Sequence, residues 1–347
     1  MTETKRHISP RKSLTSLDVA RRAGVSRTTV SYVLSDNGVR NAHVSEETRA
    51  KVLQAAQELG YSIHSSARAL RKGHSEEICV IIDLPLTVHR TELLVSLQQY
   101  AFLRGYTPVV YFSYNLSTEQ VQELLLKIFG RRPMGIFATA RSMTAEHVAL
   151  AKHMGVENIV LYSVKPVEYA HTIILPTMSA GYLAAQHLLE RGHRHLGLVH
   201  PSDPLHKYGF LQRLEGMRSA IAGAPEVTLD ILPLQYSPSD AHALVDTYLT
   251  GADHPTGIYA FNDEYALLLL GALTDRGIQV PCDVAIMGTD DITFGEFVRP
   301  TLTTIRFDDI SIGQRAIEML ITLYKHQPLP EELSHPLIPH LVPRGST

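Results

Sequence analysis

With 347 residues, 44% of them hydrophobic, the chain is long enough to form two or three domains with well-buried cores. No stretch approaches about 18 consecutive apolar residues and the N-terminus lacks an apolar leader, so we expect neither membrane insertion nor export. The two cysteines, Cys79 and Cys282, predict neither a disulfide framework nor a metal cluster. We therefore expect a cytoplasmic protein without a cofactor.

The net charge of −3 conceals two oppositely charged parts of the chain. Residues 1–73 contain 13 Lys and Arg against 6 Asp and Glu, a net charge of +7, and the other residues carry a net charge of −10. A basic N-terminal part on an acidic body is expected if only the N-terminal part meets phosphate groups. The charge distribution therefore points to nucleic acid as a partner of residues 1–73.

Residues 15–34, TSLDVARRAGVSRTTVSYVL, have the pattern of two short helices joined by a tight turn. Thr15 and Asp18 form the Ser/Thr-x-x-Asp/Glu signature of a helix start. Gly24 can end this helix in a turn, and Ser26 can cap a second helix. The second helix exposes short or flat polar side chains that suit base edges and phosphates: Arg27, Thr28, Thr29, Ser31 and Tyr32. The stretch predicts a helix-turn-helix, although any small helical hairpin with a polar face would fit the same pattern.

The neighbouring segments complete an N-terminal domain over residues 14–62. Residues 1–13 are polar, basic and aperiodic, and we expect them to be disordered. A third helix is predicted to start at a cap on Ser45 and to end at Gly60. Residues 63–74 can form a helix but are too short and polar to be stable alone, so they fit either a hinge helix that folds on binding or an ordinary linker.

Over residues 75–347, apolar strands alternate with helices. The predicted strands cover 78–83, 107–112, 134–139, 158–163, 171–175, 195–200, 227–234, 257–262 and 284–291. The predicted helices cover 90–104, 118–129, 144–154, 179–191, 209–222, 238–249, 264–276 and 311–325. This alternation predicts two parallel sheets flanked by helices, with ligands at the carboxyl ends of the strands.

Eight motifs occur in a specific order: LDVARRAGVSRTTVSYVL (17–34), VSEETRAKVLQAAQELGY (44–61), ARAL (67–70), RGHRHLGLV (191–199), RLEGMRSAI (213–221), FNDEYALLLLGALTDRGIQVPCDVAIMGTDD (261–291), RPTLTTI (299–305) and GQRAIEML (313–320). Their joint order and spacing resemble the lactose-repressor (LacI-type) family of bacterial transcription regulators. The resemblance implies an α/β protein with a three-helix helix-turn-helix head, a hinge helix over residues 63–74, and a two-lobed body like that of periplasmic binding proteins.

The resemblance also implies which residues meet DNA. Arg27 and Thr28 open the recognition helix and would reach base edges in the major groove. Tyr32 stands where many relatives have arginine, and a phenol cannot bind guanine through two hydrogen bonds, so the half-site sequence is left open. Phosphate contacts are expected from several side chains, for which capping or simple exposure is the alternative: Thr15, Ser26, Thr29, Ser31 and His43.

In this family, paired hinge helices enter the minor groove, which assigns roles to Ala67 and Leu70. Leu70 would wedge into the central base step and kink the duplex. Ala67 is small and lies one turn earlier, where it would let the two hinge helices approach each other closely. A leucine packed against the body is the alternative for Leu70.

The family further implies a small-molecule effector between the two lobes. Arg213, Asn262 and Asp290 match effector-binding positions, and their donors and acceptors suit a sugar or related polyol. Arg213 is expected to open a helix, and Asn262 and Asp290 to end strands. Asp263 matches as well but can cap the helix at 264–276. The first lobe departs from the family pattern, and other residues are expected to contact the ligand there: His89, Arg90 and Phe307.

These features together predict a ligand-responsive repressor of transcription. A homodimer would place two heads on near-palindromic double-stranded operator DNA, and the effector would change operator affinity. A two-lobed solute-binding protein is the alternative, but it requires export and no basic helix-turn-helix. An enzyme is not expected, because the sequence contains no nucleophile elbow, phosphate-binding loop or dinucleotide-binding motif. The 18 histidines show no metal-binding spacing, so we expect no metal site.

The C-terminal sequence LVPRGST, residues 341–347, has two interpretations. LVPRGS matches the thrombin-cleavage remnant of an expression vector. It also matches the L-V-x-R-x-S strand that commonly ends members of the family, and we favour this second interpretation.

Overall fold

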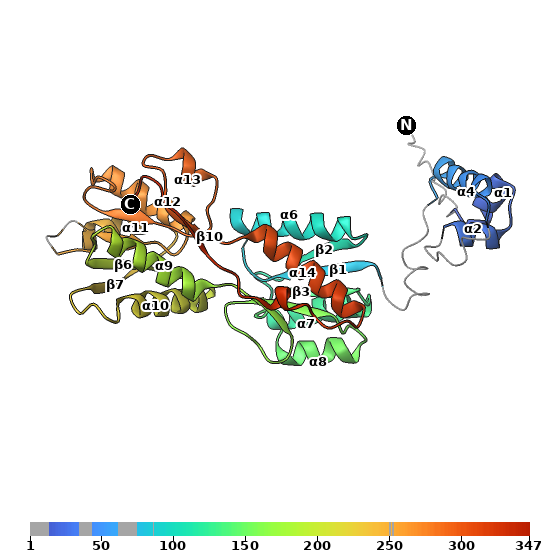
Figure 1. The fold of residues 1–347 in the computed structure, drawn as a ribbon, viewed down its shortest axis with the longest axis horizontal. Coiled ribbons are helices and arrows are strands. Elements are labelled where there is room, and N and C mark those ends of the chain that lie inside the picture. The colour runs from blue at the N-terminus through green and yellow to red at the C-terminus, as the bar shows by residue number, and fades with distance from the viewer. Residues whose placement is uncertain (1–13, 35–43, 62–74, 86, 250, 252) are drawn as a thin grey trace, which may run out of the picture. The chain divides into compact units, whose positions relative to one another are not determined.

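The computed structural model describes residues 14–34, 44–61, 75–85, 87–249, 251 and 253–347 (Figure 1). The chain divides into two compact units, Met1–Ser75 and Glu76–Thr347. Three predictions fall outside the described residues: the disordered tail over 1–13, the hinge helix over 63–74, and the DNA contacts of His43, Ala67 and Leu70. None of the described helices is both long and apolar enough to span a bilayer.

The described part of the first unit is a three-helix head made of α1 (Ser16–Ala23), α2 (Arg27–Val33) and α4 (Glu46–Leu59). Asp18 Oδ2 accepts hydrogen bonds from both the backbone N and the Oγ1 of Thr15, at 2.8 and 2.7 Å. Gly24 ends α1 with a φ of 67°, a left-handed conformation that glycine adopts without strain. The core of the head consists of small apolar side chains: Val19, Ala20, Val30, Val33, Val52, Ala55 and Ala56.

The first half of the body, which we call the N lobe, is a parallel five-stranded sheet with helices on both faces. Its strands are β1 (Glu77–Ile82), β2 (Thr107–Phe112), β3 (Gly135–Thr139), β4 (Ile159–Ser163) and β5 (His171–Ile174), in the order β2-β1-β3-β4-β5. Its helices are α6 (Val88–Leu103), α7 (Thr118–Gly130), α8 (Ala145–His153) and α14 (Asp309–Tyr324).

Alternate residues of β1 pack against opposite layers of helices, as expected for a strand that is buried on both faces. Val80 packs in the cluster that includes residues of α6 and α14, and Ile81 packs in the cluster that includes residues of α7 and α8. These two pairs of helices lie on opposite sides of the sheet (Figure 1). The chain's late helix α14 thereby belongs to the N lobe, which sequence order alone does not reveal.

The second half of the body, the C lobe, has a parallel four-stranded sheet. Its strands are β6 (His195–Pro201), β7 (Thr228–Leu234), β8 (Gly257–Tyr259) and β9 (Ala285–Met287), in the order β7-β6-β8-β9. Its helical segments are α9 (Thr177–Glu190), η1 (Pro204–His206), α10 (Lys207–Ile221), α11 (Pro238–Leu244), η2 (Val245–Leu249), α12 (Asp263–Asp275) and α13 (Phe294–Phe297). The predicted helix over 238–249 is therefore α-helical only to Leu244 and continues as the π-helical turn η2.

Helices α9 and α10 pack unusually closely because each presents a glycine to the other. A Cβ on Gly181 of α9 would overlap the backbone carbonyl of Arg213, and one on Gly216 of α10 would overlap the carbonyl of Met178. Only glycine fits at these two crossing points. The contact fixes the backbone of Arg213, which points to a positioning role for Gly181.

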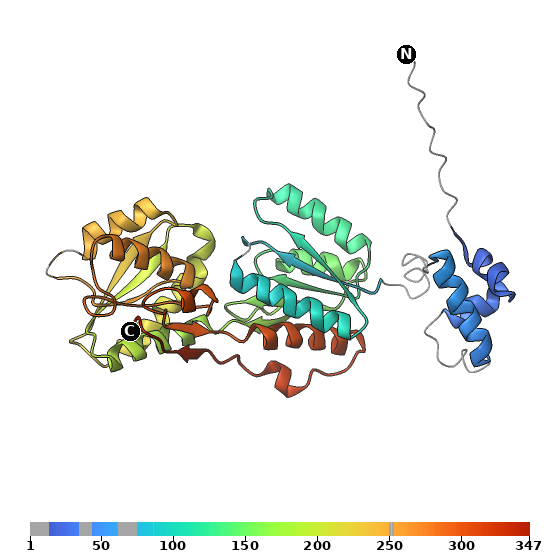
Figure 2. The same ribbon diagram turned by 90° about the horizontal axis from the view of Figure 1, so that it is seen from above.

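The chain crosses between the lobes between β5 and α9, again between β10 (Thr304–Arg306) and α14, and a third time between α15 (Glu331–Ser334) and β11 (His340–Val342). Strands β10 and β11 pair antiparallel, and both views show them next to the C lobe (Figure 2). The last residues are held in the C lobe: Arg344 pairs with Asp291 at 2.7 Å, and the backbone N of Ile286 donates to the carbonyl of Ser346 at 2.9 Å.

Several sequence predictions need correction at the edge of the C lobe. The strand predicted over 257–262 ends at Tyr259, and the one predicted over 284–291 ends at Met287. Asp290 and Asp291 follow with φ values of 108° and 50°, which are incompatible with a continuing strand. The antiparallel pair β10–β11 was not predicted, apart from a terminal strand in LVPRGST. An apolar run therefore predicts too long a strand when the chain turns but remains buried after the strand has ended.

Candidate functional site

A cavity of about 470 Å³ lies between the N lobe and the C lobe, and we call it the interlobe cavity. The N-lobe residues that line it lie at or after the carboxyl ends of β1, β3, β4 and β5 or in α6, and the C-lobe residues include some that follow β8 and β9. The carboxyl ends of parallel strands are where open α/β sheets bind ligands. Its charged lining residues are Asp83, Arg90, Arg141, Lys165, Arg213 and Asp290.

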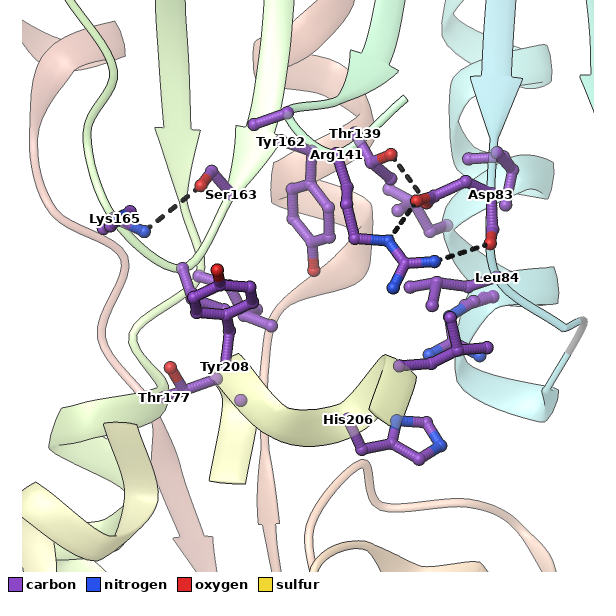
Figure 3. Close-up of a pocket in the computed structure, with 18 of the residues that line it drawn as sticks. Asp83, Leu84, Thr139, Arg141, Tyr162, Ser163, Lys165, Thr177, His206 and Tyr208 are labelled. Atoms are coloured by element: carbon purple, nitrogen blue, oxygen red, sulfur yellow. Dashed lines mark hydrogen bonds and ion pairs between the residues drawn. The ribbon is translucent and has the colours of Figure 1, made fainter. Parts of the chain in front are cut away.

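Asp83 and Arg141 form an ion pair on the N-lobe wall of the cavity (Figure 3). Asp83 Oδ2 accepts a hydrogen bond from Arg141 Nε at 2.6 Å, and its Oδ1 accepts one from Thr139 Oγ1 at 2.6 Å. Asp83 directly follows β1, and Thr139 ends β3, its neighbour in the sheet. The carboxylate of Asp83 is therefore neutralised within its own lobe.

Arg90 lies in the first turn of α6, where Thr87 caps the helix by accepting a hydrogen bond from the Arg90 backbone N at 3.3 Å. The guanidinium of Arg90 donates through Nη1 to the carbonyl of Pro85 at 2.6 Å. Burial lowers the pKa of Arg90, and the charge of Asp290 partly offsets this effect. An arginine remains protonated at neutral pH even so, and Arg90 therefore brings a partly buried positive charge to the cavity.

Arg213 is the corresponding cation of the C-lobe wall, and only 4% of it is exposed. The sequence predicted that Arg213 would open a helix, but it lies in the second turn of α10. Its Nε donates to the hydroxyl of Tyr259 at 3.3 Å, and its Nη1 donates to the carbonyl of Gly209 at 3.3 Å. The guanidinium lies 4.4 Å from the ring centre of Phe261, a cation–π contact. These contacts hold Arg213 through neutral groups alone.

Asn262, rather than Asp263, caps α12, since Asn262 Oδ1 accepts a hydrogen bond from the backbone N of Tyr265 at 3.1 Å. Asp263 is buried and holds the segments that follow β9. Its Oδ2 accepts a hydrogen bond from the Ile292 backbone N at 2.9 Å, and its Oδ1 accepts one from Thr304 Oγ1 at 2.6 Å. Burial raises the pKa of Asp263 well above its usual value. Asp263 thus has a structural role, whereas Asn262 both caps α12 and lines the cavity.

His206 of η1 also lines the cavity, and its ring centre lies 4.8 Å from that of Phe261. Burial is the main cause that lowers the pKa of His206 to about 4. The positive charges of three arginines act in the same direction: Arg90, Arg213 and Arg141. His206 is therefore neutral at physiological pH, chiefly because it is buried and in smaller part because three arginines lie near it.

Two tyrosines and a threonine complete the cavity. Tyr162 of the N lobe and Tyr208 at the start of α10 both line the cavity, and Figure 3 shows their rings near each other. Thr177, at the start of α9, is 1% exposed, and its hydroxyl has no hydrogen-bond partner among the described residues. A buried hydroxyl without a partner is costly, which makes Thr177 a candidate for a bond to a ligand.

The structure brings four predicted effector residues together at the cavity: Arg90, Arg213, Asn262 and Asp290. Phe307 is 3% exposed, packs in the main core and is not among the lining residues, so the structure does not place it at the cavity. His89 is placed by its backbone alone, in the first turn of α6. Asp83 and Tyr162 were missed, although they fall at the ends of predicted strands, where ligands are expected. His206 and Tyr208 lie in a segment that gave no signal.

The head presents a separate polar surface on α2. Arg27, Thr28 and Ser31 are exposed, and Tyr32 is half-buried. Arg27 Nε donates to Ser16 Oγ at 3.0 Å, which ties the stem of this side chain to α1 and leaves its terminal nitrogens as donors.

Two of the predicted phosphate contacts, Ser26 and Thr15, also serve as helix caps. Ser26 Oγ accepts a hydrogen bond from the Thr29 backbone N at 3.0 Å, and its distance to Thr29 Oγ1 is 2.9 Å. Thr15 bonds Asp18 at the start of α1. The roles of these residues and of Ser31 in DNA binding stay predictions, and so do those of His43, Ala67 and Leu70, which lie outside the described residues.

Comparison with known proteins identifies both parts of the chain. Residues 15–63 match the bacterial regulatory proteins of the lacI family, and residues 185–347 match the periplasmic binding protein-like domain. The HTH-type transcriptional repressor PurR of Actinobacillus pleuropneumoniae is 30% identical over 312 residues, which cover 89% of this chain and 90% of the relative. PurR of Haemophilus influenzae is 29% identical over 313 residues, which cover 89% of this chain and 91% of the relative.

Solved structures share the fold. A lac repressor dimer bound to operator and the anti-inducer ONPF matches with a TM-score of 0.80 and 24% identity, over 96% of this chain and 99% of that one. The complex of the regulator CelR with cellobiose matches with a TM-score of 0.65 and 23% identity, over 96% of this chain and 100% of that one. A helix-turn-helix head and a two-lobed body with an interlobe cavity define a ligand-responsive, DNA-binding regulator of transcription. The chain belongs to the LacI family of bacterial regulatory proteins.

Proposed function

We propose that the protein is a cytoplasmic, homodimeric repressor whose affinity for operator DNA is set by a small molecule in the interlobe cavity. The observation that carries this proposal is the cavity itself, because polar groups of both lobes face it while a polar surface is exposed on α2. Arg90 comes from the N lobe, and Arg213, Asn262 and Asp290 come from the C lobe. We assign these four side chains to the effector.

A ligand that touches both lobes can favour one arrangement of the lobes over another. It changes DNA affinity only to the extent that it binds the two arrangements with different affinities. The chain crosses between the lobes three times, so the lobes can change their angle without separating. This is the physical route by which a molecule in the cavity would alter operator binding.

In the head, we assign base contacts to Arg27 and Thr28, the first two residues of α2. Both side chains are exposed. An arginine can donate two hydrogen bonds to guanine, and a threonine can bond a base edge or touch a thymine methyl group. Tyr32 lies one helical turn after Thr28 and is assigned a further contact on the same face.

The decisive experiment is selection of bound duplexes from a random DNA pool by the full-length protein, with and without a mixture of metabolites. A near-palindromic site should emerge under at least one of the two conditions. Replacing Arg27 with Gln should then weaken binding to the selected site by about 10- to 100-fold, because base contacts of this kind are lost. The matched control is Arg22→Gln, which removes an exposed arginine paired with Glu58 at 2.5 Å.

Two results would contradict the proposal. One is the absence of any enriched sequence under both conditions. The other is an equal loss of affinity in the Arg27 and Arg22 variants, because the head would then bind DNA through charge alone and without reading the sequence.

A further inference from the structure

We propose that the effector is an anion, a small metabolite with a phosphate or carboxylate group that binds between Arg90 of the N lobe and Arg213 of the C lobe. This inference rests on the proposed function, because it names the chemical class of the molecule assigned to the interlobe cavity. It departs from the uncharged sugar that the family resemblance suggests.

The first argument is the charge of the lining residues. Four cationic side chains and two carboxylates line the cavity: Arg90, Arg141, Lys165, Arg213, Asp83 and Asp290. Asp83 is already paired with Arg141 at 2.6 Å. Three cations therefore face the single remaining carboxylate of Asp290, and His206 is neutral. The lining side chains carry a net positive charge, which Glu264 near Arg90 and Asp203 near His206 offset in part, and a ligand with negative charge would offset the rest.

The second argument is the way in which Arg90 and Arg213 are held. Neither guanidinium has a carboxylate oxygen within 4.0 Å among the described residues. Their hydrogen bonds go to neutral acceptors, namely the carbonyl of Pro85 for Arg90 and the Tyr259 hydroxyl and Gly209 carbonyl for Arg213. Buried charges in proteins are normally paired, because removal from water is costly. Arg213 is buried and Arg90 is half-buried, and together they place two positive charges without a carboxylate partner on opposite walls of one cavity, where an anion would neutralise them.

The third argument is the balance of donors and acceptors. A guanidinium has five N–H donors and no acceptor, so the two arginines keep several donors after their bonds to the protein. Among the side-chain acceptors, Asn262 Oδ1 already accepts a hydrogen bond from the Tyr265 backbone N, which leaves the Asp290 carboxylate as the charged acceptor for a donor of the ligand. A polyol needs donors and acceptors alike, whereas phosphate and carboxylate oxygens only accept. The cavity therefore suits an acceptor-rich group, which arginine can bind through two parallel bonds.

The low pKa of His206 is consistent with this assignment, because Arg90, Arg213 and Arg141 all act to lower it. The rest of the ligand would lie between Tyr162 and Tyr208, whose rings offer apolar faces (Figure 3). A volume of about 470 Å³ is within the range for small-metabolite sites. The ligand is thus a compact molecule with a charged end and a less polar body.

The test measures binding to the full-length protein by calorimetry and by thermal unfolding, with inorganic phosphate, citrate, glucose 6-phosphate and glucose as probes. At least one anion should bind and raise the unfolding temperature, its affinity should fall with added NaCl, and glucose should bind at least about 10-fold more weakly than the best anion. Phosphate and citrate distinguish a phosphate group from a carboxylate as the recognised chemistry.

Variants locate the anion. Arg90→Gln should weaken binding of the anion by about 10- to 100-fold, and Arg90→Lys should retain part of the affinity because it keeps the charge but loses the planar pair of donors. The matched control is Arg218→Gln, which removes the same charge from the exposed side of α10 and should leave binding unchanged.

The proposal is overturned if no anion stabilises the protein, if glucose binds as tightly as the best anion, or if Arg90→Gln and Arg218→Gln behave alike. Operator binding is measured separately, so the two proposals can fail independently. If operator binding responds to a neutral ligand instead, the proposed function stands and the anionic effector is ruled out. If an anion binds but no DNA site is selected, the anionic ligand stands and the proposed role as a repressor is ruled out.

Discussion

The N-lobe and C-lobe walls of the interlobe cavity hold their charged groups in different ways. On the C-lobe wall, Arg213 is buried and held by neutral partners. One of these partners is the hydroxyl of Tyr259, which lies 2.6 Å from Thr289 Oγ1. On the N-lobe wall, Asp83 and Arg141 neutralise each other, and Arg90 is attached to its own lobe through Pro85. On the C-lobe wall Arg213 is thus held by several contacts, whereas the N-lobe wall adds Arg90, which is held by the carbonyl of Pro85.

This difference suggests a division of labour. The residues that match the family pattern, Arg213, Asn262 and Asp290, all belong to the C lobe. Arg90 of the N lobe lies in a stretch where the sequence departs from that pattern. We infer that the C-lobe wall binds the ligand whatever its chemistry, whereas the N-lobe wall selects the chemistry. The predictions below follow from this comparison.

The largest effect is expected from Arg213→Met, because Met fills similar space without any donor. Binding of every ligand, charged or neutral, should weaken by about 100-fold or more through the loss of charge-assisted hydrogen bonds. Calorimetry on the purified protein measures this, with Arg218→Met on the same helix as the control. If Arg213→Met weakens the binding of anions but not of neutral ligands, the proposed difference between the two walls is wrong, because both walls would then select anions.

A smaller effect is expected from pH, through His206. The unfolded chain takes up a proton at this residue near pH 6.5, whereas the folded body resists protonation until about pH 4. The unfolded state therefore binds more protons between these values, and the free energy of unfolding should fall by about 2 kcal/mol from pH 7 to pH 5 because of His206. The difference between the wild type and His206→Gln in denaturant titrations isolates this contribution from the other histidines.

His206 also sharpens the comparison of the walls, since the charges that face it come from both lobes. Arg90 and Arg141 belong to the N lobe, and Arg213 belongs to the C lobe, while Asp203 acts in the opposite direction. Arg90→Gln should raise the pKa of His206, which NMR of the imidazole can follow. An unchanged pKa in that variant would show that the charge of Arg90 does not act on His206.

The smallest effect is expected from Thr177→Val at the crossing between the lobes. This change removes a buried hydroxyl that has no partner among the described residues, so the unliganded body should become more stable by up to about 1 kcal/mol. Ligand binding should weaken a few-fold. Thr172→Val is the control, because Thr172 Oγ1 donates to the carbonyl of Ala170 at 3.2 Å and its loss should destabilise the body. Destabilisation by both variants would remove Thr177 from the binding site.

The sequence predicts the head and the order of the body's elements well, because periodicity and helix caps are local signals. Ser26 caps α2 and Ser45 caps α4, as predicted from the sequence. Prediction fails where distant segments meet. The assignment of α14 to the N lobe and the pairing of β10 with β11 depend on packing between residues far apart in the chain.

The cavity was predictable to a similar extent. Arg213, Asn262 and Asp290 could be named from motifs, since they lie in segments that resemble the family. Asp83 and Tyr162 could have been found from the strand-end rule alone. His206 could not, because its role arises from stacking on Phe261 and from the surrounding arginines, which only the folded structure brings together.

The end of the chain has a practical consequence. LVPRGS is a sequence that thrombin cuts in an extended, accessible segment, yet here Arg344 pairs with Asp291 and Glu296, and Ser346 is fully buried. Cleavage therefore requires this segment to detach from its place beside β9. Where cleavage is slow compared with reclosing, its rate is proportional to the fraction of molecules in which the segment is open. The rate of thrombin cleavage at this site therefore measures the local stability of the C-terminal segment of the C lobe.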